Sequence, residues 1–119
     1  MDNHTPANFE CKFHFDNLEE ATQDSVRERV AYAIDHKMSG ILLKIHAHRS
    51  DARVLFRIDL QKNKKDLFNG TFSMYYPGIE KDFDFADEAW VRYEREDYVN
   101  LNDLVSHAFS NFKERFANS

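Results

Sequence analysis

The sequence has a single cysteine and no long apolar run, and each shortage excludes a class of protein. Cys11 alone cannot form an internal disulfide or a site of several thiolates, which fits a reducing compartment. The longest aliphatic run, 41–43, is far too short to span a membrane, and the first residues lack the basic and apolar segments of a signal peptide. We therefore expect a cytoplasmic protein without a membrane segment.

The sequence also lacks the common motifs of enzymes and metal sites. With three glycines it has no glycine-rich phosphate loop, and it contains no Gly-x-Ser-x-Gly elbow. No helix start lies beside Cys11 to lower its pKa, so we expect a structural thiol. His46 and His48 have no third ligand nearby, and the acidic loop at 79–88 lacks the spacing of a calcium site. We expect no catalysis, no metal or other cofactor and no small-molecule substrate.

Apolar residues are plentiful enough for one core. Of the 119 residues, 42% are hydrophobic and 14% are aromatic. That apolar surface can offset the conformational entropy of a chain of single-domain size. Residues 1–8 show no periodicity and predict a disordered N-terminal tail, so we assign a single domain to residues 9–119.

Alternation of apolar and polar residues predicts four strands. The first runs from 9 to 15 and the second from 54 to 60. The third covers 68–76, with Gly70 as a bulge, and the fourth covers 90–95.

Apolar residues at steps of three and four predict two amphipathic helices. The first spans 22–47, with Thr22 or Asp24 as its cap. Ser39-Gly40 can bend or end this helix, and if the helix ends there, residues 41–45 form a strand instead.

The second helix spans 101–116 and is capped by Asn100 or Asn102. The predicted element order is β-α-β-β-β-α. This order favours an α+β two-layer sandwich, in which an antiparallel-rich, four-stranded sheet has both helices packed on one face.

The charge is unevenly distributed along the chain. The net charge of −5 argues against a simple nucleic-acid binder, yet residues 22–66 carry ten Lys/Arg against six Asp/Glu. Two helices side by side could place basic side chains around a groove for a phosphate backbone. The alternative is ordinary solvated charge on helix and strand exteriors. The candidate RNA-binding residues are Arg27, Arg29, Lys37, Lys44, Arg92, Arg95, Lys113 and Arg115.

Four short segments resemble, in the correct order, motifs of one family across residues 9–116. The segments are Asn17-Leu18-Glu19 with Thr22, Val26-Arg27-x-x-Val30, Tyr76-Pro77-Gly78, and Glu96-Asp97-Tyr98 with Asp103. They are similar to the Asn-Val/Ile-Glu-x-Thr, Leu-Arg-x-x-Val, Pro-Gly and Glu-Asp-x-Tyr-x-x-Ile-Asp motifs of the ribosome hibernation-promoting factors, the sigma-54 modulation or ribosome-associated inhibitor family. The first of these motifs carries one inserted residue here.

The resemblance implies the same β-α-β-β-β-α order and a stress-response role. It also implies rRNA binding on the small ribosomal subunit, in the channel for messenger and transfer RNA, through basic residues of both helices. Two departures matter. The family usually ends its last helix in a dense Lys/Arg run, where this chain has only Lys113 and Arg115, and the loop at 79–87 is long and acidic. Ribosome binding could therefore be weakened, redirected or lost.

The alternative function is a non-catalytic protein-interaction domain on the same fold. In that case the acidic loop or the open face of the sheet makes the contact. Leu55, Tyr75 and Tyr93 would point outward there and could form a homodimer interface.

Overall fold

The structure, a computed structural model, describes three stretches of the chain, residues 9–48, 54–75 and 90–117. Three features of the sequence prediction lie outside them: the tail at 1–8, the Tyr76-Pro77-Gly78 segment and the acidic loop at 79–88.

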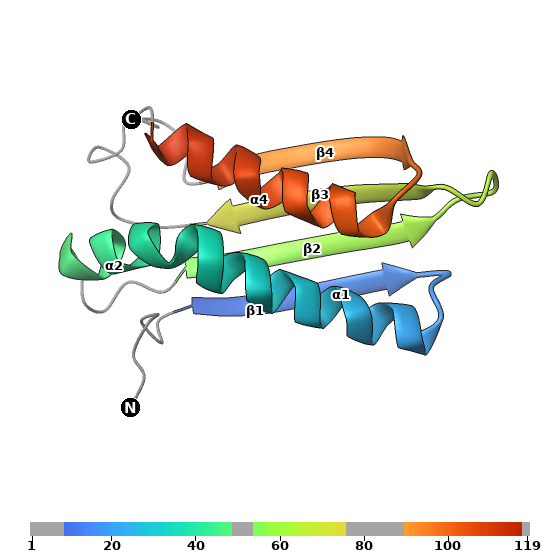
Figure 1. Ribbon diagram of the computed structural model, residues 1–119, viewed down its shortest axis with the longest axis horizontal. Coiled ribbons are helices and arrows are strands. Elements are labelled where there is room, and N and C mark those ends of the chain that lie inside the picture. The colour runs from blue at the N-terminus through green and yellow to red at the C-terminus, as the bar shows by residue number, and fades with distance from the viewer. Residues whose placement is uncertain (1–8, 49–53, 76–89, 118–119) are drawn as a thin grey trace.

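The sheet is mixed and four-stranded, in the order β1-β2-β3-β4. β1 and β2 pair in parallel, whereas β2 with β3 and β3 with β4 are antiparallel. The predicted α+β sandwich with its β-α-β-β-β-α order is confirmed, and both helices cover the same face of the sheet (Figure 1). The strands are β1 (Phe9–Asp16), β2 (Val54–Lys62), β3 (Phe68–Tyr75) and β4 (Trp90–Tyr98).

The first helical stretch is continuous through the predicted weak point. α1 (Glu20–Ala33) runs into a π-helical segment (Ile34–Met38) and then into α2 (Ser39–His48), so the alternative of a strand at 41–45 is wrong. Leu42 and Ile45 are both buried. Their burial outweighs the helix penalty of a glycine, which is about 1 kcal/mol.

The starts of the two main helices differ from each other in how they are capped. α1 begins at Glu20 after Glu19, which makes no side-chain capping bond, so Thr22 and Asp24 are wrong as caps. α4 (Leu101–Ala117) is capped as predicted by Asn100, whose Oδ1 accepts a hydrogen bond of 3.1 Å from the backbone N–H of Asp103.

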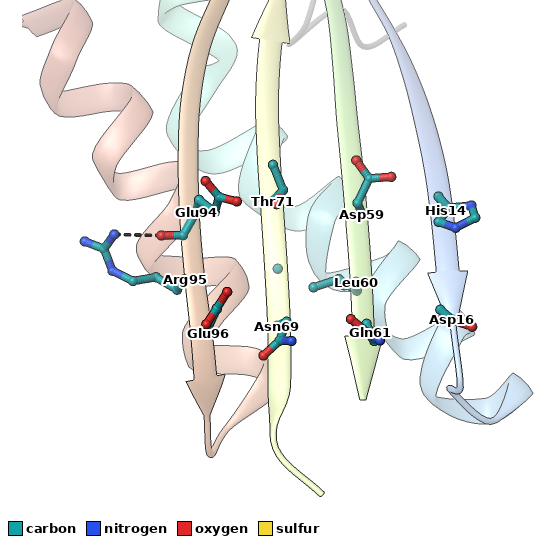
Figure 2. A pocket seen from close by; sticks show the side chains of 11 residues that line it. His14, Asp16, Asp59, Leu60, Gln61, Asn69, Thr71, Glu94, Arg95 and Glu96 are labelled. Carbon is teal, nitrogen blue, oxygen red and sulfur yellow. Dashed lines mark hydrogen bonds between the residues drawn. The ribbon is translucent and has the colours of Figure 1, made fainter. Parts of the chain in front are cut away.

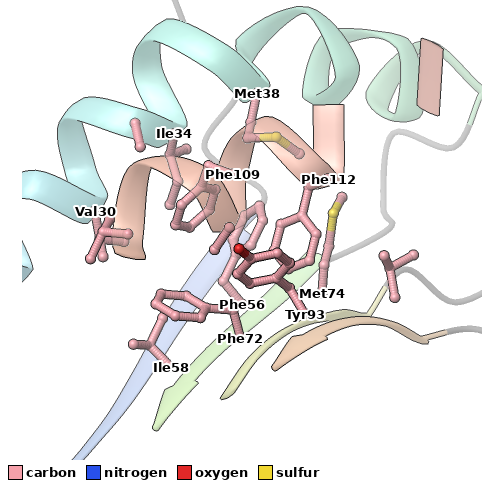
Figure 3. Packing of buried hydrophobic residues seen from close by; sticks show 14 of the residues in the cluster. Val30, Ile34, Met38, Phe56, Ile58, Phe72, Met74, Tyr93, Phe109 and Phe112 are labelled. Carbon is pink, nitrogen blue, oxygen red and sulfur yellow. The ribbon is translucent and has the colours of Figure 1, made fainter. Parts of the chain in front are cut away.

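The core lies between the helices and the inner face of the sheet. Phe109 of α4 contacts aromatic rings from the sheet and from its own helix, with ring centroids 5.8 Å from Phe56, 6.2 Å from Phe72 and 5.5 Å from Phe112 (Figure 3). All four rings are fully buried. Burying one such side chain contributes about 1.5–3 kcal/mol, so this cluster holds the two layers together.

Tyr93 belongs to this core, and its predicted outward position is wrong. Its side chain is 7% exposed and its ring lies 6.4 Å from that of Phe72. Val91 and Tyr93 occupy alternate positions of β4 and are both buried, which assigns them to the inner face. Leu55 and Tyr75 are half-buried on the open face, as predicted.

Gly70 lets α4 pack closely on the sheet. A Cβ at this position would lie 2.8 Å from Leu60 Cδ2 and 3.0 Å from Leu104 Cδ2. The predicted irregularity at Gly70 is present, but the extra residue lies in β4, because Phe68 pairs with Tyr98 and Gly70 with Arg95.

Candidate nucleic-acid interface

Lys37 lies in the π-helical segment after α1 and reaches across to α4. Its Nζ donates hydrogen bonds to the backbone oxygen of Ser106 (3.2 Å), to Ser106 Oγ (3.2 Å) and to Ser110 Oγ (2.6 Å). All three acceptors are neutral, so these bonds hold the ammonium group in place between the helices without cancelling its charge. Lys37 is thus a fixed positive charge beside α4.

Arg29 and Lys113 are exposed cations on the two helices that Lys37 connects, α4 and the helical stretch that begins with α1. Arg29 precedes the buried Ala33 by one turn of α1, and Lys113 follows Ser110 by one turn of α4. Both side chains are exposed. We call Arg29, Lys37 and Lys113 the interhelix group.

Arg27 lies on the opposite flank of α1, over β1. Its guanidinium carbon is 5.7 Å from the ring centroid of Phe13 and 5.2 Å from that of Phe15. Its Nη1 also donates to Asp24 Oδ1 at 3.2 Å. Arg27 therefore covers the edge of the sheet and is separate from the interhelix group.

Three of the predicted arginines gather around β4. The guanidinium carbon of Arg95 lies 4.4 Å from the ring centroid of Tyr93, and Arg115 Nη2 donates to the backbone oxygen of Arg92 at 3.4 Å. Lys44 is exposed on α2. The eight predicted residues thus form an interhelix group, a β4 group, and the separate residues Arg27 and Lys44.

The helical layer has no excess of positive charge. Residues 20–48 carry four Lys/Arg and four Asp/Glu, and residues 101–117 carry two of each. The predicted basic residues therefore lie on helices that carry no net positive charge. Any contact with phosphate there depends on local groups of cations.

The open face of the sheet carries its charges in rows. In the strand register, Lys12 of β1 lies opposite Arg57 of β2, Arg57 lies opposite Ser73 of β3, and Ser73 lies opposite Arg92 of β4. Because neighbouring strands are about 4.8 Å apart, the row is about 14 Å long. We call Lys12, Arg57 and Arg92 the cationic row.

The next row toward the other end of the sheet has the opposite charge. It contains His14, Asp59, Thr71 and Glu94, which lie level with one another on the four strands (Figure 2). This acidic row borders a shallow pocket of about 290 Å³. Arg57 Nε contacts Asp59 Oδ2 at 3.3 Å and so links the two rows.

Sequence reasoning missed Lys12 and Arg57 as site residues. Each occupies a polar position of an alternating strand, and that pattern alone indicates only solvent exposure. The cationic row exists because of the strand register. Residue spacing within one strand does not fix this register. The cationic row also contains Arg92, one of the predicted residues.

A second hollow lies between β1 and α1. It has a volume of about 390 Å³ and is bordered by apolar residues, among them Phe9, Phe13 and Ile34. Burial, and then the nearby Glu10 carboxylate, raises the pKa of the Cys11 thiol at its edge to about 11. Cys11 is therefore a protonated thiol at neutral pH, in agreement with a structural rather than a nucleophilic cysteine.

Two kinds of feature are absent from the described parts of the chain. Among residues 9–48, 54–75 and 90–117, no three histidine, cysteine or acidic side chains come together as metal ligands would. Within the same stretches, every helix is too short or too polar to cross a membrane.

Comparison with known proteins gives a structural match without a sequence match. No protein-family model matches the chain, and no curated protein matches its sequence. The fold is similar to the crystal structure of the Protein Y N-terminal domain from Thermus thermophilus, with a TM-score of 0.51 and 16% sequence identity. The match covers 89% of this chain and 93% of that one, so the chain has the fold of a Protein Y N-terminal domain along nearly all of its length.

Proposed function

We propose that this protein is a cytoplasmic ribosome-associated factor that binds the small ribosomal subunit through rRNA and inhibits translation during stress. The observation that carries the proposal is the match in fold to the Protein Y N-terminal domain over 89% of the chain. Protein Y is a ribosome hibernation-promoting factor, the family whose motifs the sequence resembles. The proposal involves no catalysis.

The interhelix group is the part of the helical layer best suited to phosphate. Lys37 is held by three hydrogen bonds to α4, and Arg29 and Lys113 are exposed cations on the same pair of helices. A positioned cation loses less conformational entropy on binding than a free one does. Because the proposed contacts join cations to phosphates, the affinity should fall steeply as salt is added.

The experiment is co-sedimentation with purified small ribosomal subunits over a range of salt concentrations. We expect wild type to sediment with the subunits at low salt. The double variant Arg29→Glu/Lys113→Glu should fail to do so, because it reverses two charges of the interhelix group. The control Lys64→Glu/Lys65→Glu makes the same change of charge in the β2–β3 turn, where both side chains are exposed, and should sediment like wild type.

Two results would contradict the proposal at different levels. Failure of wild type to sediment at any salt concentration would exclude the ribosomal partner. Equal sedimentation of the interhelix variant and wild type would keep the partner and exclude the helical layer as the contact.

The open face gives less support to a homodimer than the sequence suggested. With Tyr93 in the core, only Leu55 and Tyr75 of the three predicted contact residues lie on that face, beside charged rows. Interface centres are depleted in charged residues. We therefore do not extend the proposal to self-association, and a monomer mass by light scattering is the expected result.

A further inference from the structure

We infer that the open face of the sheet is a second RNA-contacting surface, on which the cationic row holds the backbone of a single strand. The inference rests on the proposed function only in taking RNA as the ligand. It adds Lys12, Arg57 and Tyr75 to the residues that contact it and assigns Arg92 to this face.

The charges of the cationic row are available to a ligand. Lys12 and Arg92 are exposed and form no ion pair with another described residue. Arg57 retains 59% side-chain exposure despite its contact with Asp59. Ser73, between Arg57 and Arg92 in the register, is short and only 7% exposed, so the cationic side chains extend beyond it.

A row with two apolar members, Leu55 and Tyr75, borders the cationic row on the side away from the acidic one, and Glu10 of β1 lies level with Leu55 in it. Leu55 and Tyr75 lie opposite each other on β2 and β3. Each is two residues from a member of the next register pair on the same face, Arg57 or Ser73. Single-stranded RNA is bound elsewhere by open sheets that combine basic side chains with aromatic rings on which bases stack. Here a phosphate on the cationic row would place its base over Tyr75 and Leu55.

The acidic row decides which polyanion fits. Asp59 and Glu94 lie one same-face step from Arg57 and Arg92, about 7 Å along the strands. A broad anionic surface such as a membrane, or the two backbones of a duplex, would cover both rows and be repelled by the carboxylates. A narrow single strand that follows the cationic row across the strands would avoid them.

The test uses the whole chain and a fluorescent ten-nucleotide RNA of mixed, non-self-complementary sequence, followed by anisotropy at several salt concentrations. The variant Lys12→Gln/Arg92→Gln removes the two unpaired charges of the row. We expect its affinity to fall roughly tenfold. The slope of its salt dependence should decrease by about 0.7 for each phosphate that the variant no longer neutralises.

A charge-matched control and a reciprocal variant make the result specific. Lys64→Gln/Lys65→Gln removes two charges from the β2–β3 turn and should change affinity less than twofold. Glu94→Gln removes a repulsive carboxylate and should strengthen binding. Circular dichroism of each variant separates loss of binding from loss of fold.

The inference is overturned if the row variant binds as tightly as wild type, if the turn control weakens binding equally, or if wild type does not bind the oligonucleotide. Preference for a duplex of the same length would also overturn it. The ribosomal proposal is decided separately by sedimentation. A protein that binds the oligonucleotide through the row but does not sediment with subunits would retain this inference and lose the proposed function.

Discussion

The two faces of the sheet are made by the same four strands and have opposite properties. On the inner face, Phe56, Phe72 and Met74 are fully buried against the helices. On the open face, Arg57, the sequence neighbour of Phe56, belongs to the cationic row. Because successive side chains of a strand point to opposite faces, each strand contributes to both surfaces.

The difference teaches which substitutions should affect folding and which should affect binding. Inner-face side chains make close apolar contacts, so their loss leaves a cavity. Open-face side chains are solvated, and exposed charge pairs contribute little to stability. Substitutions on the inner face, at the sheet edge and on the open face should therefore have successively smaller effects on stability.

Phe109→Ala should have the largest effect on stability. The ring is 0% exposed and contacts Phe56, Phe72 and Phe112, so its removal leaves a cavity between the two layers. We expect a loss of about 3–5 kcal/mol in the free energy of unfolding, measured by urea denaturation. Phe109→Leu is the control and should lose clearly less. A loss below about 1 kcal/mol for the alanine variant would contradict the assignment of Phe109 to the centre of the core.

The fold could largely be predicted from the sequence because burial leaves a periodic signal. The alternation in β1 and β2 and the spacing of Leu104, Ala108 and Phe112 in α4 each report a buried face. The signal fails where the pattern is weak. The run Trp90-Val91-Arg92-Tyr93 has no clear alternation, and the predicted outward position of Tyr93 is wrong.

The helix start and the segment after Gly40 show a different limit. Thr22 and Asp24 are good caps by residue type, but α1 begins before them at Glu20, and Asp24 pairs with Arg27 instead. The sequence left residues 41–45 open between helix and strand. Tertiary burial of Leu42 and Ile45 decided between the two, and local propensity does not contain that information.

The candidate site was less predictable than the fold. Basic residues can be found by type, but their grouping depends on which strands and helices lie together. Lys37 was predicted as an RNA-binding residue from its type. Its hydrogen bonds to Ser106 and Ser110 arise only when the first helical stretch packs beside α4. Lys12 and Arg57 were missed because the cationic row requires the register of the four strands.

Cys11 lies at the edge of the sheet and should make stability depend on alkaline pH. Burial first, and then Glu10, raises its pKa from 9.0 to about 11 in the folded protein. Below pH 9 the thiol is protonated in both states. Between these two pKa values the unfolded chain loses its proton while the folded protein keeps it, so stability falls as the pH rises.

The measurement compares wild type with Cys11→Ala by urea denaturation at pH 8 and pH 10.5. Because Cys11 is only partly buried, we expect wild type to lose roughly 1 kcal/mol more than the variant over this interval. Cys11→Ala also serves as the control for the tyrosine and lysine side chains that titrate in the same pH range, because both proteins contain them. Parallel losses in both proteins would show that the thiol is not shielded from water.

The smallest effect is expected from Arg57→Gln, and its sequence neighbour Ile58 provides the matched comparison. Arg57 is 59% exposed with a single ion pair to Asp59, so its replacement should change the free energy of unfolding by less than about 0.5 kcal/mol. Ile58 is 1% exposed on the inner face, and Ile58→Val should cost about 0.5–1.5 kcal/mol although it removes only one methylene group. If Arg57→Gln were the more destabilising of the two in thermal or urea unfolding, the open face would be part of the structural framework. If Arg57→Gln leaves stability unchanged, the fold does not need the charge at Arg57, and a role in binding at the open face can account for it.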